Sequence, residues 1–438
     1  YREYKVTPET LRTSAGRIID LTEKSEPALS VKAQEADLDK NHETARKIAR
    51  DCIVMLKNDG GILPVKKGQR VAVIGARAKQ PMIMGFGSSQ INAHKIDSPL
   101  DEFIRLGIPV SYAPAYDPSD PDKINDDAFD YAKKTAASCD IALVFISASE
   151  LDVCEGAERL SMQLPASQNA IVEQIASVNR NIAVILTSGS SVTMPWIDKV
   201  KGLVQTYLLG EAMGGAVSDV LLGRLSPSGK LAETYPLKLS DCPAYSHMAP
   251  DVDDNIEYKE SIFVGYRYYD TADIPVLFPF GYGLSYTTFE YSGMKISASD
   301  ITEDDEIAAE IDVRNTGAYD AAEIVQLYIG CKGDSTVFRP RKELKAFTKV
   351  YIKRGETAHI RFELSRDDFA YYSIKAHDWK VETNEYSIMI GSSSKDIKAE
   401  KTVMIESLDK KFRERDYYNA VPEYFGKDIK DIPDEAFE

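Results

Sequence analysis

Residues 141–168 read IALVFISASELDVCEGAERLSMQLPASQ, and this stretch decides the fold. Its first six residues, Ile141–Ile146, are all apolar, which predicts a strand buried on both faces of a sheet. Pro165 then opens a helical pattern. The apolar residues of that pattern share one face: Ala170, Ile171, Ile175 and Val178. A buried strand followed by an amphipathic helix is the building unit of an α/β fold.

The loop between this strand and this helix is strongly acidic. It contains the carboxylates Glu150, Asp152, Glu155 and Glu158, with Gly156 and Arg159 beside them. In an open α/β sheet, ligands bind where the carboxyl ends of the strands lead into their loops. The loop therefore predicts a functional site. The alternative is an acidic turn whose only role is to be solvated.

Composition limits the class of protein and the class of partner. A chain of 438 residues has room for about two to three domains. The net charge of −16 at pH 7 disfavours nucleic acid and anionic membranes as partners. No apolar run approaches the roughly 20 residues that a membrane-spanning helix needs. We therefore expect neither nucleic acid nor a membrane to be a partner.

The cysteines and histidines predict a reducing compartment and no metal. The five cysteines are scattered and odd in number, which indicates reduced thiols in a cytoplasmic, bacterial protein rather than a disulfide framework. The five histidines are scattered as well, and no Cys-x-x-Cys is present, so we expect no metal site and no cofactor. The chain begins at Tyr1 without an initiator methionine or a signal-peptide core, which suggests a fragment or a processed product.

Residues 43–243 alternate helical and strand patterns, which predicts a mostly parallel sheet with helices on both faces. Besides the strand at 141–146, the strands are expected at Val71–Gly75, Ile182–Thr187 and Leu203–Tyr207. Helical patterns cover His42–Lys57, Asp126–Ala137 and Ala216–Leu222.

Two loops of this region, each following a predicted strand, contain glycine and serine. Gly85–Ser89 lacks the GxGxxG spacing and the following Lys-Ser/Thr of nucleotide loops, so nucleotide binding is disfavoured. Gly189-Ser190-Ser191 lacks the GxSxG pattern of a nucleophilic serine, and no histidine is positioned to support one. Neither loop therefore predicts nucleotide or serine-hydrolase chemistry.

The remaining segments have distinct characters. Residues 1–42 predict a helix that starts at Thr7-Pro8-Glu9, followed from Thr22 to Lys40 by a polar connector. Residues 244–285 are rich in aromatic side chains and predict an extended wrap whose rings mainly pack. Residues 406–438 predict a charged extension.

Residues 286–405 predict a β-sandwich of immunoglobulin-like size. Apolar and polar residues alternate along several short segments: Ile307–Arg314, Ala322–Ile329, Phe347–Ile352, Thr357–Leu364 and Tyr386–Ile390. The Cys…Trp…Cys signature of disulfide-bonded antibody domains is not present in the sequence. The fold class is therefore α/β plus all-β.

Several long motifs, in this order, closely resemble the family 3 glycoside hydrolases, which include β-glucosidases and β-xylosidases. They are GFGSSQIN at 85–92, CEGAERLSMQLPASQNAIVE at 154–173, GEAMGGAVSDVLLGRLSPSGKLAETYP at 210–236, LFPFGYGLSYTTFEYS at 277–292 and RPRKELKAF at 339–347. The resemblance extends from about Val6 to Ile397. It implies an (α/β)6 sandwich domain and a fibronectin-type-III-like domain. It also implies a catalytic barrel that is absent from this chain, with residues 1–42 as its trailing helix and a linker.

The resemblance implies retaining hydrolysis by two carboxylates. The family's nucleophile is a barrel aspartate, and no matching motif exists in these residues. The family's general acid/base is the glutamate of a Glu-Gly-x-Asp-Arg loop, which corresponds here to Glu155, with Glu158 in place of the aspartate. Glu158 and Arg159 are then expected to support the loop as a pair. Glu150 and Asp152 remain rival candidates for the acid/base.

The resemblance also implies a β-glucoside or oligosaccharide substrate with a terminal β-D-glucosyl residue. Ser88, Ser89 and Gln90 would contact the sugar, at a place where relatives often carry arginine. A β-xylosidase of the same family remains an alternative, as does a non-catalytic carbohydrate-binding or assembly module. Formation of a homo-oligomer stays open.

Overall fold

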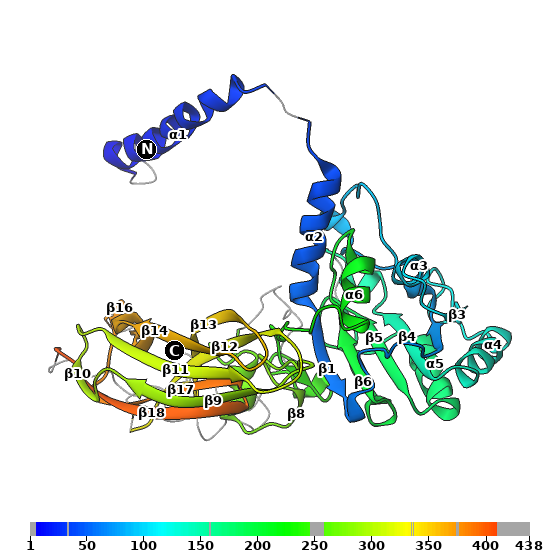
Figure 1. Ribbon diagram of the computed structural model, residues 1–438. Coiled ribbons are helices and arrows are strands. Elements are labelled where there is room, and N and C mark those ends of the chain that lie inside the picture. The colour runs from blue at the N-terminus through cyan, green and yellow to red at the C-terminus, as the bar shows by residue number, and fades with distance from the viewer. Residues whose placement is uncertain are drawn as a thin grey trace. The chain divides into compact units, whose positions relative to one another are not determined.

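The computed structural model describes residues 6–32, 35–156, 159–245, 258–333, 335, 337–373 and 376–409. The chain divides into two compact units, Tyr1–His42 and Glu43–Glu438. The second unit contains an α/β part and a β-sandwich (Figure 1). Among the described helices, none combines the length and the apolar character that crossing a membrane requires.

Helix α1, Pro8–Leu29, begins where the sequence predicts. The Thr7 hydroxyl accepts a hydrogen bond from the Thr10 backbone N–H at 3.1 Å, which caps the first turn. The predicted polar connector over Thr22–Lys40 is wrong, because α1 runs on to Leu29 and helix α2, Leu38–Cys52, starts before the connector ends. Glu, Lys, Ala and Leu are good helix formers, so polarity alone did not end the helix.

The α/β part is built on one six-stranded sheet. Its strands are β1 (Val54–Asn58), β2 (Val71–Ile74), β3 (Val110–Ala113), β4 (Ile141–Ser147), β5 (Ile182–Thr187) and β6 (Gly202–Gln205). They lie in the order β1-β6-β5-β4-β2-β3. All neighbouring pairs are parallel except β1 with β6. The predicted mostly parallel sheet is confirmed.

Alternation along β4 explains why its sequence is apolar throughout. Ile141, Leu143 and Phe145 belong to one core, together with residues of helices α3 (Pro99–Arg105) and α6 (Met213–Leu221). The residues between them belong to a second core, with residues of α4 (Asp126–Ala137) and α5 (Ala166–Val178). Successive side chains of a strand point to opposite faces, so a sheet covered on both sides needs apolar residues at every position.

The helix predicted over His42–Lys57 is wrong beyond Cys52. The residues from Val54 onward form the edge strand β1 instead, with Val54 paired to Gln205 in antiparallel register. Consecutive apolar residues suit a buried helix as well as a strand. The partner strand β6 lies far away in sequence, so the local pattern did not reveal the pairing.

The predicted β-sandwich is confirmed. One sheet has the order β10-β18-β17-β12-β13 and the other the order β14-β11-β9. The bounds are β9 (Phe289–Ile296), β10 (Asp300–Thr302), β11 (Ile307–Asn315), β12 (Ala321–Cys331), β13 (Glu343–Ile352), β14 (Thr357–Leu364), β17 (Asn384–Ser393) and β18 (Asp396–Glu406). A short helix α8 (Arg366–Phe369) and a hairpin of β15 (Tyr371–Ser373) and β16 (Asp378–Lys380) join β14 to β17. Alternate residues of both sheets fill the core between them.

The aromatic stretch contains more regular structure than predicted. Its described residues include helix α7, Tyr266–Thr271, and strand β8, Val276–Phe278, which pairs with β7, Tyr235–Pro236. The expectation of an extended wrap is therefore wrong there. The packing role of several rings is confirmed, since they are buried: Phe263, Tyr268, Tyr269 and Phe278.

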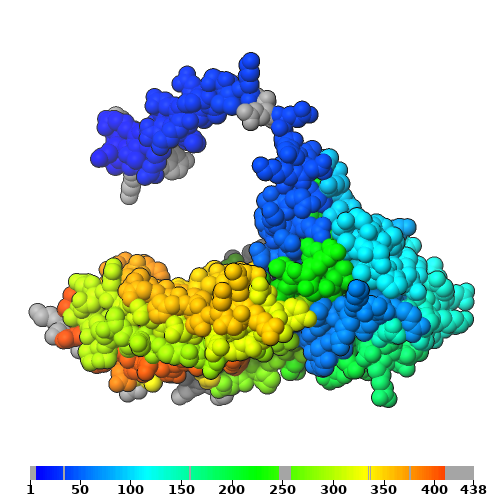
Figure 2. Space-filling view, in the orientation of Figure 1, coloured from blue at the N-terminus to red at the C-terminus, as the bar shows by residue number. Residues whose placement is uncertain are grey.

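The sandwich and the α/β part are fastened by buried polar contacts within the second unit. Lys230 forms an ion pair with Glu323 at 3.1 Å, and both side chains are almost fully buried. The Gln326 side-chain amide donates to the Gly281 carbonyl at 3.1 Å. Figure 2 shows the yellow and orange surface of the sandwich against the blue and green surface of the α/β part.

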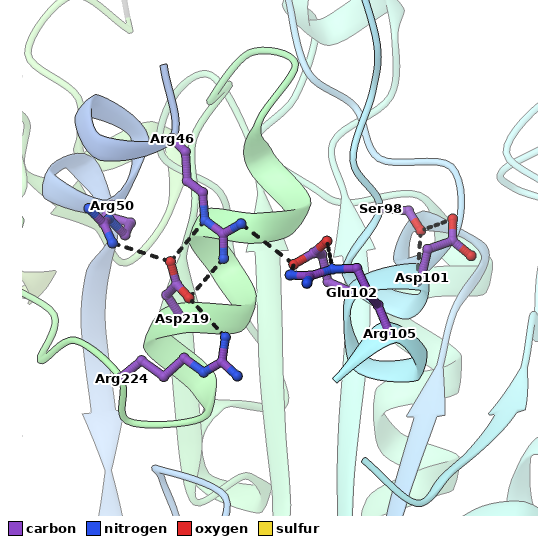
Figure 3. Close-up of polar contacts among 8 residues, drawn as sticks. All are labelled: Arg46, Arg50, Ser98, Asp101, Glu102, Arg105, Asp219 and Arg224. Carbon is purple, nitrogen blue, oxygen red and sulfur yellow. Dashed lines mark hydrogen bonds and ion pairs between the residues drawn. The ribbon is translucent and has the colours of Figure 1, made fainter. Parts of the chain in front are cut away.

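A cluster of arginines around one carboxylate holds α2, α6 and α3 together (Figure 3). Asp219 of α6 is 4% exposed and accepts two hydrogen bonds from Arg46 of α2, at 2.9 and 3.0 Å. Arg50 adds a contact at 3.4 Å, and Arg224 one at 3.8 Å. Arg46 also reaches Glu102 of α3 at 3.6 Å. Asp219 is thus engaged as a structural counter-ion.

Candidate active site

The acidic loop after β4 lies at the edge of the sheet where several parallel strands end. Because β2, β4, β5 and β6 are parallel neighbours, their carboxyl ends lie along one edge. The loops that follow β2 and β5 are the two glycine-and-serine loops. Hydrogen bonds join both of them to the acidic loop, so the three loops form one site.

The first part of the acidic loop is fixed by polar contacts. Arg77, which follows β2 and is 9% exposed, donates to the Ser147 hydroxyl at 3.1 Å and to Glu150 at 3.3 Å. The Ser149 hydroxyl donates to Asp152 at 2.8 Å. The two rival carboxylates, Glu150 and Asp152, are therefore engaged in holding the loop.

Glu155 lies against the loop that follows β2. Its backbone N–H donates to the Phe86 carbonyl at 3.2 Å, and the Phe86 N–H donates to Val153 at 3.0 Å, so the two loops form a short parallel bridge. The Ser88 hydroxyl donates to the Glu155 carboxylate. The sequence-predicted residues Glu155 and Ser88 are thus brought together.

Glycine is required where these loops approach. Gly87 has a φ of +79°, and a Cβ there would lie 3.2 Å from the Glu155 Cβ, closer than such atoms usually approach. Gly156 has a φ of +80°, which turns the chain directly after Glu155. Both glycines therefore serve the placement of the Glu155 side chain.

Arg159 anchors the second part of the acidic loop to the loop after β5. Its guanidinium donates to the Ser190 hydroxyl at 2.7 Å and to the Ser191 carbonyl at 2.8 Å. Glu158, its predicted partner, lies outside the described residues, so the predicted pair remains a prediction. Arg159 supports the loop through backbone and hydroxyl contacts.

Ser89 and Gln90 lie beside Ser88 and are exposed. The Ser89 hydroxyl donates to the Phe86 carbonyl at 3.3 Å, and the Gln90 backbone N–H donates to the Gly87 carbonyl at 3.3 Å. The Gln90 side chain is open to solvent. These residues therefore form one short exposed turn next to Glu155.

Sequence reasoning missed two charged residues of the site. Arg77 follows the predicted strand Val71–Gly75, so the rule that strand ends share an edge could have placed it there. Glu233 accepts a hydrogen bond from the Ser191 backbone N–H at 3.0 Å. It lies in a segment with no regular period, so no sequence signal indicated it.

The arrangement is suited to proton transfer by one carboxylate. Glu155 is exposed, whereas Glu150 is paired with a buried arginine and Asp152 is bonded within its own turn. A carboxylic acid at such a place can donate a proton to a leaving group and then take one from water. Within the described residues, no group of three His, Cys, Asp or Glu side chains could hold a metal ion.

Comparison with protein families matches both parts of the chain. Residues 53–286 match the glycosyl hydrolase family 3 C-terminal domain, and residues 323–394 match the fibronectin type III-like domain. The first match alone covers more than half of the chain.

Among curated proteins, the chain is similar to thermostable beta-glucosidase B of Acetivibrio thermocellus, with 44% identity over 90% of this chain and 53% of that protein. It is also similar to an exo-alpha-(1->6)-L-arabinopyranosidase of Bifidobacterium breve, with 40% identity over 92% of this chain and 54% of that protein. The chain thus spans about half the length of these relatives.

Among solved structures, the chain resembles a family 3 beta-glucosidase of Bifidobacterium adolescentis. The TM-score is 0.88 at 37% identity, and the match covers 98% of this chain and 63% of that one. The domain matches, the relatives and the fold with its acidic loop all indicate the same family. The chain belongs to glycosyl hydrolase family 3.

Proposed function

We propose that the chain is the C-terminal part of a retaining β-glycosidase that removes terminal, non-reducing β-D-glucosyl residues. In this proposal Glu155 is the general acid/base. A barrel domain, in the same or a separate polypeptide, carries the aspartate nucleophile. Helix α1 is the trailing helix of that barrel.

The observation that carries the proposal is the way the structure holds Glu155. The Glu155 backbone N–H donates a hydrogen bond to the Phe86 carbonyl, and the Glu155 carboxylate accepts one from the Ser88 hydroxyl. Backbone and side chain are therefore both oriented. The rival carboxylates instead support the loop. Proton transfer in a transition state needs a carboxyl group held in a fixed place, and Glu155 meets that need.

Exposed leucines on the same loop support a covering domain. Leu151 is 75% exposed and Leu160 is 90% exposed, and they lie on either side of Glu155 in the sequence. Ile91, in the neighbouring loop, is 54% exposed. Apolar side chains gathered around a polar site are typical of a surface that another domain covers. Such a cover would exclude water from the space around Glu155.

The relatives support a proposal for the substrate, and the thiols support one for the compartment. The similar beta-glucosidases favour a β-D-glucoside, with Ser88, Ser89 and Gln90 near the sugar. The similar arabinopyranosidases make an α-L-arabinopyranoside the second candidate, ahead of a β-D-xyloside. All five cysteines are unpaired, which supports a reducing cytoplasm, and the similar bacterial proteins support a bacterial source.

Residues 1–438 alone should not hydrolyse glycosides, because the proposed nucleophile is not among them. We expect no turnover of an aryl β-D-glucoside by the purified chain, and turnover by the polypeptide that also contains the barrel. Aryl β-D-xylosides and α-L-arabinopyranosides, assayed in parallel, determine which sugar is preferred.

The control for this assay is the Glu155→Ala variant of the isolated chain. Activity of the isolated chain that persists through purification and disappears in Glu155→Ala would contradict the proposal. Sugar binding by the chain, with no turnover even when the barrel is present, would favour the non-catalytic carbohydrate-binding module.

A further inference from the structure

The turn after β5, residues 188–191, is held from two sides. Arg159 donates to the Ser190 hydroxyl and to the Ser191 carbonyl, at 2.7 and 2.8 Å. Glu233 accepts from the Ser191 N–H at 3.0 Å. The Ser191 carbonyl thus contacts Arg159 of the acidic loop. The Ser191 N–H contacts Glu233, in the segment that precedes β7.

This turn is the second of two supports for the stretch that contains Glu155. The first support is the bridge between Phe86 and residues 153–155. The second is the 188–191 turn, which anchors Arg159, and Arg159 follows Glu155 after the turn at Gly156. If the 188–191 turn shifts, Arg159 loses its anchor and the chain after Glu155 is held at one end only.

Glu233 is a half-buried carboxyl group near Arg159. Burial raises the pKa of Glu233, while the hydrogen bond from Ser191 and the nearby charge of Arg159 act in the opposite direction. Two further nitrogen atoms of Arg159, Nε and one terminal nitrogen, are buried without a hydrogen-bond partner in the described structure. A buried guanidinium of this kind requires a negative charge close by.

We propose that Glu233 is a positioning residue for the Glu155 loop, acting through the Ser191 backbone and Arg159. The inference rests on the proposed role of Glu155 as acid/base. Glu233 then does not touch the substrate but determines the position of the Glu155 carboxyl group relative to the leaving group. A misplaced acid weakens proton transfer without necessarily weakening the binding of the sugar.

The first test is hydrogen exchange on residues 1–438, which requires no activity. In Glu233→Ala the Ser191 N–H loses its acceptor, so the amides of 188–191 and of 150–156 should exchange ~10-fold faster or more, as expected for losing one hydrogen bond to a charged group. Glu233→Gln keeps an acceptor oxygen, so its exchange rates should lie between those of the wild type and those of Glu233→Ala. Glu303→Ala is the matched control, because Glu303 also accepts a hydrogen bond from a backbone N–H, that of Leu408, but in the sandwich. It should leave these amides unchanged.

The second test measures how kcat/KM of the complete enzyme depends on the leaving group of the substrate. A dinitrophenyl glucoside needs little protonation, whereas a phenyl glucoside needs the acid. In Glu233→Ala the ratio of their kcat/KM values should rise ~10-fold, through kcat rather than KM. In Glu303→Ala the ratio should stay that of the wild type. A residue that only stabilises the fold would lower both rates equally.

The outcomes separate this inference from the proposed function. If Glu155→Ala shows the leaving-group effect but Glu233→Ala changes neither exchange nor the ratio, the Glu233 inference is wrong and the proposed function stands. If Glu155→Ala shows no leaving-group effect, the proposed function fails and the inference with it. Should Glu233→Ala not fold, Glu233→Gln decides, since it conserves size and removes the charge. A wild-type ratio and wild-type exchange in that variant would overturn the inference.

Discussion

Replacing Glu155 by alanine in the complete enzyme should lower kcat/KM for glucosides with poor leaving groups by ~10²–10⁴-fold, the usual contribution of general acid catalysis. The structure gives the reason, since Glu155 is the carboxylate held at the sheet edge by Phe86 and Ser88. An activated aryl glucoside needs little protonation. It should form the glycosyl-enzyme at nearly the normal rate and then stall, because no base activates water.

Azide provides the diagnostic measurement. As an anion, azide attacks the glycosyl-enzyme without a general base, so it should restore turnover of Glu155→Ala and yield the β-glucosyl azide. Glu150→Ala is the matched control on the same loop. It should disturb the loop through Arg77 and show no rescue by azide. Full activity of Glu155→Ala, combined with rescue of Glu150→Ala or Asp152→Ala, would assign the acid/base to a rival.

Asp219→Ala should destabilise the α/β part by about 3–5 kcal/mol, the effect of removing one partner from a buried ion pair. Asp219 is 4% exposed and accepts three hydrogen bonds from Arg46 and Arg50. Without it, Arg46, Arg50 and Arg224 lose the carboxylate that they share, and Arg46 keeps its ion pair with Glu102. Glu173→Ala, which removes the exposed pair with Lys199, should cost no more than about 1 kcal/mol.

Tryptophan fluorescence can follow the unfolding of the α/β part by itself. Trp196 is fully buried in the core of the α/β part, whereas Trp379 is half-exposed on the sandwich. In a Trp379→Phe background, denaturant unfolding followed by fluorescence reports on Trp196 alone. Asp219→Ala and Glu173→Ala should then differ clearly in midpoint. Equal midpoints would show that the arginine cluster contributes nothing specific.

The α/β sheet could be predicted because its central strands carry their own signal. A strand buried on both faces needs apolar residues throughout, and Ile141–Ile146 and Ile182–Thr187 show this directly. Edge strand β1 follows helix α2 after the single residue Ile53, and only its antiparallel pairing with β6 decides its state. Local pattern cannot supply that pairing.

The site was predictable in part. Ser88 and Glu155 follow two parallel strands of one sheet, so their meeting agrees with the rule that strand ends share an edge. The family resemblance, rather than spacing, singled out Glu155 among four carboxylates. The contacts of Arg77 and Glu233 depend on side chains brought together from distant segments, which no local pattern encodes.

We propose that these residues supply the acid/base while the nucleophile lies outside them. A dinitrophenyl β-glucoside with fluorine beside the anomeric carbon traps the glycosyl-enzyme, because the fluorine slows its hydrolysis. Peptide mass mapping of the trapped complete enzyme then locates the attached sugar. We expect an adduct on an aspartate outside residues 1–438 and unmodified peptides throughout them. An adduct on Glu155, or on any other carboxylate of these residues, would contradict it.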